Sequence, residues 1–161
     1  MYHYYLFHKP FGCVTARRDG RYPTVMDWFS ALDNPDLSPV GRLDRETEGL
    51  LLITGVLRNG EDTPTASARI TVTGKSTLGA VLPALHPEIQ EKSRHNPMDR
   101  PVTFGSITIT EGRNRQIRRM MKTQRLLVLD LKRVKMGAFA LPEGLKPGEW
   151  VEISPDFDGN R

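Results

Sequence analysis

The sequence predicts an α+β fold whose sheet is mixed and largely antiparallel. Short segments that alternate between apolar and polar residues are numerous, whereas only two segments carry an amphipathic helical pattern. The chain has 161 residues, of which 38% are hydrophobic and 26% charged, enough for a self-sufficient core without disulfides. We therefore expect one domain over residues 1–161, with a division into two small lobes as the alternative.

The first third of the chain combines strands with one helix. Residues 2–8 are rich in aromatic side chains and predict a strand, which the proline and glycine of residues 9–12 end. Residues 24–32 follow a proline and place their apolar side chains at helical spacing, so they predict a short helix. Residues 50–53 are a short apolar run and predict a buried strand, although the run alone also fits a helix.

The remainder contains further strands and a polar connection. Alternation predicts strands at 67–73 and 104–110. Residues 76–85 are ambiguous because Gly79 and Pro83 weaken a helix. The other predicted elements are an exposed loop, a long strand and a turn-rich return that ends in a strand, at 86–101, 126–136 and 141–153.

Positive charge is concentrated in one segment. The net charge is +4, yet residues 112–135 hold nine basic side chains and one acidic one, a local charge of +8. Within it, residues 113–124 predict a helix with an apolar face of Ile117, Met120 and Met121. The opposite face carries Arg115, Arg118, Arg119 and Lys122. This pattern fits a polyphosphate partner such as a nucleic acid, and a solvated basic helix is the alternative.

Several classes of protein are excluded. No apolar run approaches the ~20 residues of a membrane span, and no secretion signal is evident, so we expect a cytoplasmic protein. The single cysteine, Cys13, excludes an internal disulfide framework. Phosphate-binding loops are absent and the four histidines lack metal-ligand spacing, so we expect no cofactor and no metal.

Residues 41–54, GRLDRETEGLLLIT, place an acid between two bases ahead of the apolar run. Asp44 lies between Arg42 and Arg45, and neighbouring cations favour an ionised carboxylate. Such a carboxylate serves as a nucleophile or a base. The alternative is a turn aspartate in a structural ion pair.

Four ordered motifs of the chain resemble the bacterial ribosomal RNA pseudouridine synthases of the small-subunit pseudouridine synthase A type. Residues 8–12 (HKPFG) resemble the family's N-terminal motif, and residues 41–54 its catalytic-aspartate motif. Residues 111–120 resemble its basic motif, and 131–137 with 145–150 its closing strands. Because the KPxG part of the first motif starts at Lys9, the resemblance leads us to expect the single-domain branch of the family, without an S4-like RNA-binding domain.

The resemblance implies a cofactor-independent isomerisation of uridine to pseudouridine in ribosomal RNA, in a cleft flanked by helices. Asp44 matches the catalytic aspartate, Arg118 the basic residue that pairs with it, and Arg42 the residue that holds the flipped nucleotide. The partner is ribosomal RNA, free or in a partly assembled subunit, and we expect a monomer. The further expected RNA contacts are Lys9, Arg45, Arg113, Arg115, Arg119 and Lys122.

The chain departs from the family pattern after Thr54. The family continues there with a turn, a helix and a strand that carries a tyrosine, whereas this chain runs directly into Gly55, and its last tyrosine is Tyr22. A natural deletion, a damaged or shortened gene product, and a sequence that has lost a segment each account for this departure. We interpret the four tyrosines as packing residues, and a catalytically silent RNA-binding remnant is the alternative function. A DNA-binding regulator is a weaker alternative, because no helix-turn-helix pattern is evident.

Overall fold

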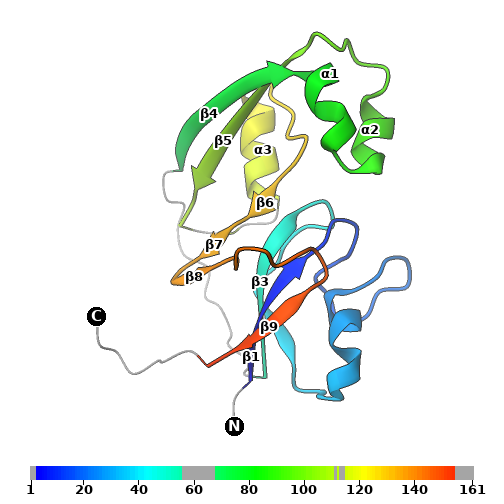
Figure 1. Ribbon diagram of the computed structural model, residues 1–161, viewed down its shortest axis with the longest axis vertical. Coiled ribbons are helices and arrows are strands. Elements are labelled where there is room, and N and C mark those ends of the chain that lie inside the picture. Colours follow the sequence, from blue (N-terminus) through cyan, green and yellow to red (C-terminus); the bar gives the residue numbers. More distant parts are fainter. Residues whose placement is uncertain (1–2, 56–67, 111, 113–114, 155–161) are drawn as a thin grey trace. The chain divides into compact units, whose positions relative to one another are not determined.

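The computed structural model describes residues 3–55, 68–110, 112 and 115–154 (Figure 1). The chain divides into two compact units. The first combines Met1–Glu61 with Asp130–Arg161, and the second comprises Asp62–Leu129.

The first unit is built on a five-stranded sheet in the order β2-β3-β1-β9, with β6 paired to β3 (Figure 1). Its strands are β1 (Tyr4–Lys9), β2 (Ser38–Val40), β3 (Glu48–Thr54), β6 (Lys132–Arg133) and β9 (Trp150–Ile153). All pairs are antiparallel except β3 with β6, which is parallel. The predicted α+β class with a mixed, largely antiparallel sheet is therefore confirmed.

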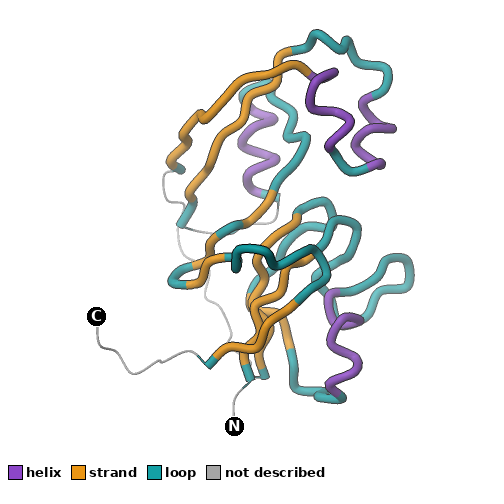
Figure 2. The backbone as a smooth tube through the Cα atoms, in the orientation of Figure 1, coloured by secondary structure: helices purple, strands orange, loops and turns teal. Residues whose placement is uncertain are grey.

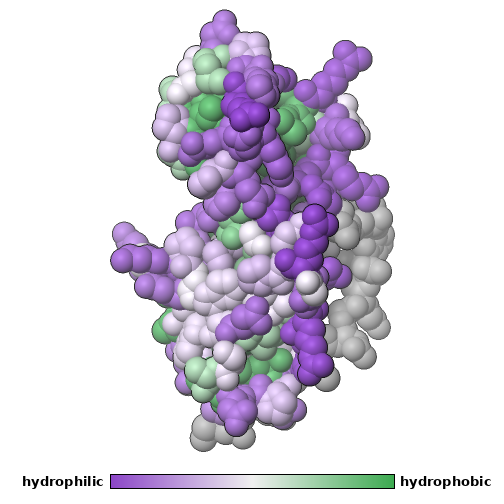
Figure 3. Space-filling model, turned by 90° about the vertical axis from the view of Figure 1, so that its right-hand side faces the viewer, coloured by the Kyte–Doolittle hydropathy of each residue, from purple (hydrophilic) through white to green (hydrophobic). Residues whose placement is uncertain are grey.

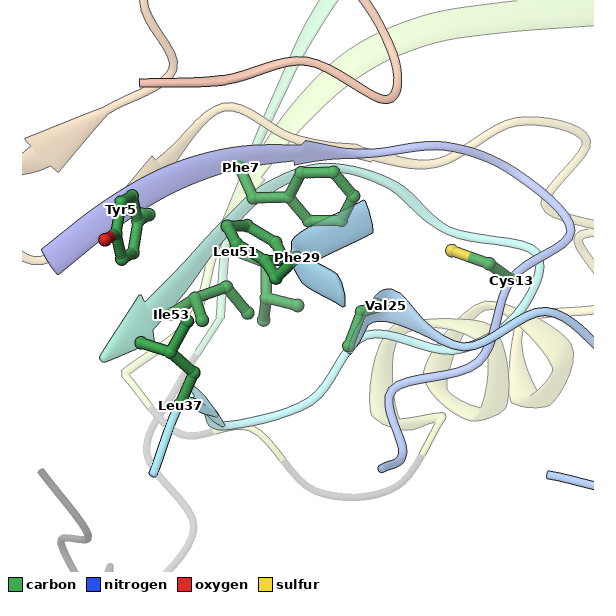
Figure 4. Packing of buried hydrophobic residues seen from close by; sticks show 8 residues of the cluster. All are labelled: Tyr5, Phe7, Cys13, Val25, Phe29, Leu37, Leu51 and Ile53. Atoms are coloured by element: carbon green, nitrogen blue, oxygen red, sulfur yellow. The ribbon is translucent and has the colours of Figure 1, made fainter. Parts of the chain in front are cut away.

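Burial explains why β1 and β3 occupy the middle of the sheet. Both strands contain an apolar run and are buried along almost their whole length, including His8 and Lys9 at the end of β1. On one face, Phe7 and Leu51 pack with Phe29 and Val25 in a cluster that also includes Tyr5, Cys13, Leu37 and Ile53 (Figure 4). The predicted strands at 2–8 and 50–53 are thus confirmed among the described residues, and they form the core of this unit.

One helix of the first unit packs on this cluster through its buried side chains, and its backbone is the helix drawn next to the sheet of this unit in Figure 2. The predicted helix at 24–32 is the 3₁₀ helix η1 (Val25–Leu32), which buries Val25 and Phe29. Its first turn is fixed by a capping box, in which the Asp27 carboxylate accepts hydrogen bonds from the Thr24 backbone N–H at 2.7 Å and the Thr24 hydroxyl at 3.0 Å.

The predicted long strand at 126–136 is wrong over its first half. Residues 126–131 have no strand structure, and two-residue strands follow: β6 and β7 (Lys135–Met136), which pairs with β8 (Phe139–Ala140). Leu126 and Leu127 are 59% and 74% exposed. Aliphatic residues favour a strand only where a neighbouring strand and a buried face are available, and Leu126 and Leu127 lack a buried face. The final strand of 141–153 is confirmed as β9.

The second unit contains a two-stranded sheet and short helices. The predicted strands at 67–73 and 104–110 are confirmed as β4 (Arg69–Thr77) and β5 (Pro101–Thr108), with residue 67 outside the described residues. The ambiguous residues 76–85 contribute α1 (Leu78–Val81) and the 3₁₀ helix η2 (Leu82–Ala84). The predicted loop at 86–101 is partly wrong, because it contains α2 (Pro87–Ser93).

Local chemistry accounts for α2. Pro87 stands at its first turn, where a proline ring fits the helix and no N–H is needed. The His86 ring accepts a hydrogen bond from the Glu88 N–H at 3.2 Å and so caps the helix. Pro87, one of the prolines from which a loop was predicted at 86–101, is therefore the first residue of a helix.

The predicted basic helix is confirmed as α3 (Gln116–Thr123). Arg115 precedes it in a left-handed conformation, with φ of 49°. Its end is a Schellman motif, in which the N–H groups of Arg125 and Leu126 donate to the carbonyls of Lys122 and Met121 at 3.0 and 2.9 Å. The apolar face is half-buried, and no residue of α3 is fully buried.

The two units differ in how much apolar surface they bury. In the described part of the second unit, the buried apolar residues are Leu78 and Ile89, whereas Ile70, Val72 and Phe104 are exposed. Hydrophilic side chains cover most of the face in Figure 3, with smaller hydrophobic patches. In the described part of the chain, no helix is long and apolar enough to cross a membrane.

This difference predicts unequal local stability. The amide hydrogens of β1 and β3 are expected to exchange most slowly, and those of β4, β5 and α3 markedly faster, because burial of apolar residues opposes local opening. Hydrogen–deuterium exchange followed by mass spectrometry of peptides tests this expectation. Equal protection of β4 and β1 would contradict it.

Candidate functional site

Residues 41–47 form the aspartate loop, which connects β2 to β3 and carries Asp44. The loop closes on itself, since the Thr47 N–H donates to the Asp44 carbonyl at 3.0 Å. It is also bound to residues 12–15: the Gly12 N–H donates to the Arg45 carbonyl at 2.8 Å. The Thr15 hydroxyl donates to the Leu43 carbonyl at 2.8 Å and accepts from the Leu43 N–H. These bonds hold the backbone on both sides of Asp44.

A buried lysine organises the same loop. Lys9 is 0% exposed, and its ammonium donates to the carbonyls of Thr47 at 2.9 Å, Pro10 at 3.1 Å and Arg45 at 3.4 Å. Burial lowers the pKa of Lys9, and interactions with Cys13, Glu48 and Asp44 partly offset this effect. The Lys9 ammonium is therefore fixed at the aspartate loop by the backbone carbonyls that surround it.

The expected contact of Lys9 with RNA is corrected by this environment. A fully buried ammonium whose donors face three carbonyls does not present its charge to a phosphate in this structure. Lys9 has the geometry of a positioning residue for the aspartate loop.

Arg45 lies against two aromatic rings. Its guanidinium carbon is 4.7 Å from the centre of the Tyr22 ring and 5.7 Å from that of Phe11. Both distances are within the range of a cation–π interaction. Its Nη2 atom also lies 3.8 Å from a Glu46 carboxylate oxygen. The sequence predicted Tyr22 only as a packing residue and Phe11 only as part of the first motif, although Arg21 next to Tyr22 was a usable signal for a cation–π contact.

The strand after the aspartate loop needs a glycine at its start. Gly49 has a φ of +105° and pairs with Arg133 of β6. A side-chain carbon at Gly49 would collide with the Arg133 carbonyl oxygen and lie 2.7 Å from its nitrogen. The Arg133 Nε–H donates to the Leu50 carbonyl at 2.7 Å, so β6 is bound to β3 by its side chain too.

The remaining predicted site residues divide between the two units. Arg42 is exposed in the aspartate loop, and Asp44 is half-buried. In the second unit, Arg118 is half-buried and donates to the Val128 carbonyl at 3.0 Å. Arg113 lies outside the described residues, and the exposed cations at α3 are Arg115, Arg119 and Lys122.

Metal ligands are not grouped in the residues that the structure describes. Among them, no three histidine, cysteine, aspartate or glutamate side chains are placed to hold a metal ion. Asp44 and the arginines of the site are suited to acid–base, nucleophilic and anion-binding chemistry.

Comparisons with known proteins identify the family. Residues 3–58 match the family described as RNA pseudouridylate synthase. The ribosomal small subunit pseudouridine synthase A of Pseudomonas aeruginosa is 33% identical over 171 aligned positions, which cover 95% of this chain and 71% of that protein. The chain belongs to the RNA pseudouridine synthase family. The RNA pseudouridine synthases are isomerases, as the sequence motifs implied.

Further RNA pseudouridine synthases agree with this assignment. The ribosomal large subunit pseudouridine synthase E of Vibrio vulnificus is 34% identical and covers 92% of this chain and 74% of that protein. A crystal structure of a pseudouridylate synthase shares the fold with a TM-score of 0.66 at 24% identity, covering 96% of this chain and 71% of that one. The alignments span 171 and 177 positions, more than the 161 residues of this chain, so these synthases contain residues that it lacks.

The tyrosines of this synthase have different environments. Tyr5 is buried in the core and Tyr4 packs on the second apolar cluster, so the interpretation as packing residues is confirmed for both. Tyr22 instead contacts the guanidinium groups of Arg45 and Arg21. Tyr2 lies outside the described residues.

The environment of Lys9 gives a testable expectation. Replacement of Lys9 with methionine keeps the shape of the side chain but removes the hydrogen bonds to the Thr47, Pro10 and Arg45 carbonyls, of which Arg45 keeps its bond from the Gly12 N–H, so the free energy of unfolding should fall by about 2 kcal/mol. Urea denaturation measures this change. The exposed Lys146→Met variant is the control and should match the wild type within about 0.5 kcal/mol.

The pH dependence of this effect has a defined sign. Because the pKa of Lys9 is lower in the folded chain than its ordinary value of 10.5, the unfolded chain binds more protons between the two values. The free energy of unfolding of the wild type should therefore rise with pH in that window relative to Lys9→Met. If the difference in free energy of unfolding between the wild type and Lys9→Met stayed constant or fell with rising pH, the burial of a charged Lys9 would be contradicted.

Proposed function

We propose that this chain isomerises a uridine of ribosomal RNA to pseudouridine, with Asp44 as the catalytic carboxylate and no cofactor. The observation that carries the proposal is the construction of the aspartate loop, in which the backbone around Asp44 is held by Gly12, Thr15 and the buried Lys9. A loop backbone held in this way preorganises the position from which the Asp44 side chain extends, which favours chemistry on a bound nucleotide. Ribosomal RNA as the substrate is inferred from the names of the relatives.

The reaction is an isomerisation and leaves the composition of the RNA unchanged. The bond between the ribose C1′ and the uracil N1 breaks, and a bond from C1′ to the uracil C5 forms. N1 gains a proton and C5 loses one. Asp44 acts on the ribose either as the nucleophile or as the base, and both roles require its ionised form.

The basic residues have distinct proposed roles. By the family resemblance, Arg118 is proposed as the basic residue that serves the catalytic aspartate, while Arg42, which is exposed two positions before Asp44 in the chain, is proposed to hold the flipped nucleotide. Removing the uridine from its stack costs a few kcal/mol. Contacts with the RNA backbone by Arg115, Arg119 and Lys122 offset this cost, and Arg113 is proposed to join them.

A catalytically silent RNA-binding protein of the same fold is the second candidate. It is favoured by the residues that the relatives contain and this chain lacks, and by the absence of any tyrosine after Tyr22. This candidate predicts salt-sensitive RNA binding without isomerisation.

Mapping of pseudouridine separates the two candidates. The purified chain is incubated with unmodified transcripts of bacterial small- and large-subunit ribosomal RNA, and pseudouridine is located by chemical adduct formation and primer extension. A new stop in one transcript is the expected result and identifies the target uridine. Binding of both transcripts without a stop would support the silent candidate.

A further inference from the structure

An exposed basic loop lies in the first unit and has no part in the function proposed above. Residues 16–22, the arginine loop, contain Arg17, Arg18, Arg21 and Tyr22 with a single acid, Asp19. All three arginines are exposed, and Tyr22 is half-buried. The loop therefore presents a net positive charge on the unit that carries Asp44.

Hydrogen bonds give the arginine loop a defined shape. One carboxylate oxygen of Asp19 accepts from the N–H groups of Tyr22 and Arg21, both at 2.8 Å, and these bonds lower the pKa of Asp19. Arg17 donates to the Pro35 and Leu37 carbonyls at 3.1 and 3.3 Å. It also donates to the Ser38 hydroxyl at 2.7 Å, so its guanidinium anchors the loop.

A stack of cations and rings joins this loop to the aspartate loop. The Arg21 guanidinium carbon lies 5.2 Å from the centre of the Tyr22 ring, and that of Arg45 lies 4.7 Å from the same ring. Arg45 directly follows Asp44 in the chain. Tyr22 thus connects a guanidinium of the arginine loop to the residue next to Asp44.

We propose that the arginine loop is a second RNA-binding element, which contacts phosphates of the strand that carries the target uridine. The proposal rests on the proposed function, since it requires that the chain binds RNA. Arg18 and Arg21 supply the phosphate contacts, and the stack of Tyr22 on Arg45 holds the loop beside Asp44. Guanidinium groups suit this partner because they bind phosphate oxygens through two parallel hydrogen bonds.

An arginine double variant tests the phosphate contacts. Binding of unmodified small- and large-subunit ribosomal RNA transcripts is measured by filter binding at several salt concentrations. Arg18→Ala with Arg21→Ala is expected to weaken binding about tenfold and to lower the salt dependence by one to two phosphate contacts. The control, Arg94→Ala with Arg100→Ala, removes two exposed arginines of the second unit and should change affinity less than about twofold.

The outcomes distinguish this inference from the proposed function. If the wild type binds neither transcript, the proposed function fails and the inference with it. If the wild type binds RNA and the Arg18→Ala, Arg21→Ala variant binds with the same affinity as the control variant, the inference alone is overturned. Circular dichroism checks that each variant is folded.

A tyrosine pair tests the positioning role of the stack. Tyr22→Phe keeps the ring that faces Arg45 and should bind RNA within about twofold of the wild type. Tyr22→Leu removes the ring and should weaken binding about fivefold. Equal affinity of the two variants would overturn the role of the stack.

Discussion

Replacement of Asp44 with asparagine is expected to lower pseudouridine formation by about a thousandfold or more, while RNA binding is retained. Asparagine has nearly the same shape as aspartate, so the hydrogen bonds of the aspartate loop backbone should persist. It has no carboxylate, and therefore serves neither as a nucleophile nor as a base at the ribose. Primer-extension mapping after incubation with ribosomal RNA transcripts measures product, and filter binding measures affinity.

A matched control isolates the role of Asp44. Asp36→Asn makes the same chemical change at an exposed position of the first unit and should leave product formation within about twofold. Full activity of Asp44→Asn would exclude Asp44 as the catalytic carboxylate. Loss of RNA binding along with activity would assign Asp44 a structural role, which is the turn interpretation that the sequence leaves open.

Replacement of Gly49 with alanine is expected to lower the free energy of unfolding by about 3 kcal/mol. Two effects add: a φ of +105° is unfavourable for alanine, and its Cβ would collide with the Arg133 carbonyl oxygen. The total is a large part of the ~5–15 kcal/mol that stabilises a typical domain. Urea denaturation followed by circular dichroism measures the loss.

A second glycine separates the two effects. Gly144 also has a positive φ, of +79°, but a Cβ added there meets nothing within 4 Å. Gly144→Ala should therefore cost only about 1 kcal/mol, for its backbone conformation. Equal losses in the two variants would show that the approach of β6 to Gly49 adds nothing to stability.

Much of the fold follows from local patterns. The buried strands β1 and β3 each contain an apolar run close to turn residues, and α3 has an amphipathic pattern over two turns. Predictions from local patterns were wrong where contacts with other segments, or the position of a residue within an element, determined the structure. Residues 126–131 have the composition of a strand yet expose Leu126 and Leu127, and Pro87 starts a helix in a predicted loop.

The candidate site was predicted unevenly for a similar reason. Motif resemblance singled out Asp44 and its neighbouring arginines, because those residues are adjacent in the chain. The environment of Lys9 depends on carbonyls up to 38 residues away, and Tyr22 is 23 positions before Arg45. Contacts between distant segments leave no periodic signal in a single sequence.

The sequence by itself determined the α+β class, the central strands, the aspartate motif and the family. Each of these depends only on consecutive residues or on the order of motifs along the chain. Only the tertiary structure decided that Lys9 is buried beneath the aspartate loop and that Tyr22 stacks on Arg45. The physical reason is that burial and charge compensation depend on which distant segments meet. From its residue type alone, a lysine is expected to be exposed. Lys9 is buried because three backbone carbonyls accept hydrogen bonds from its ammonium.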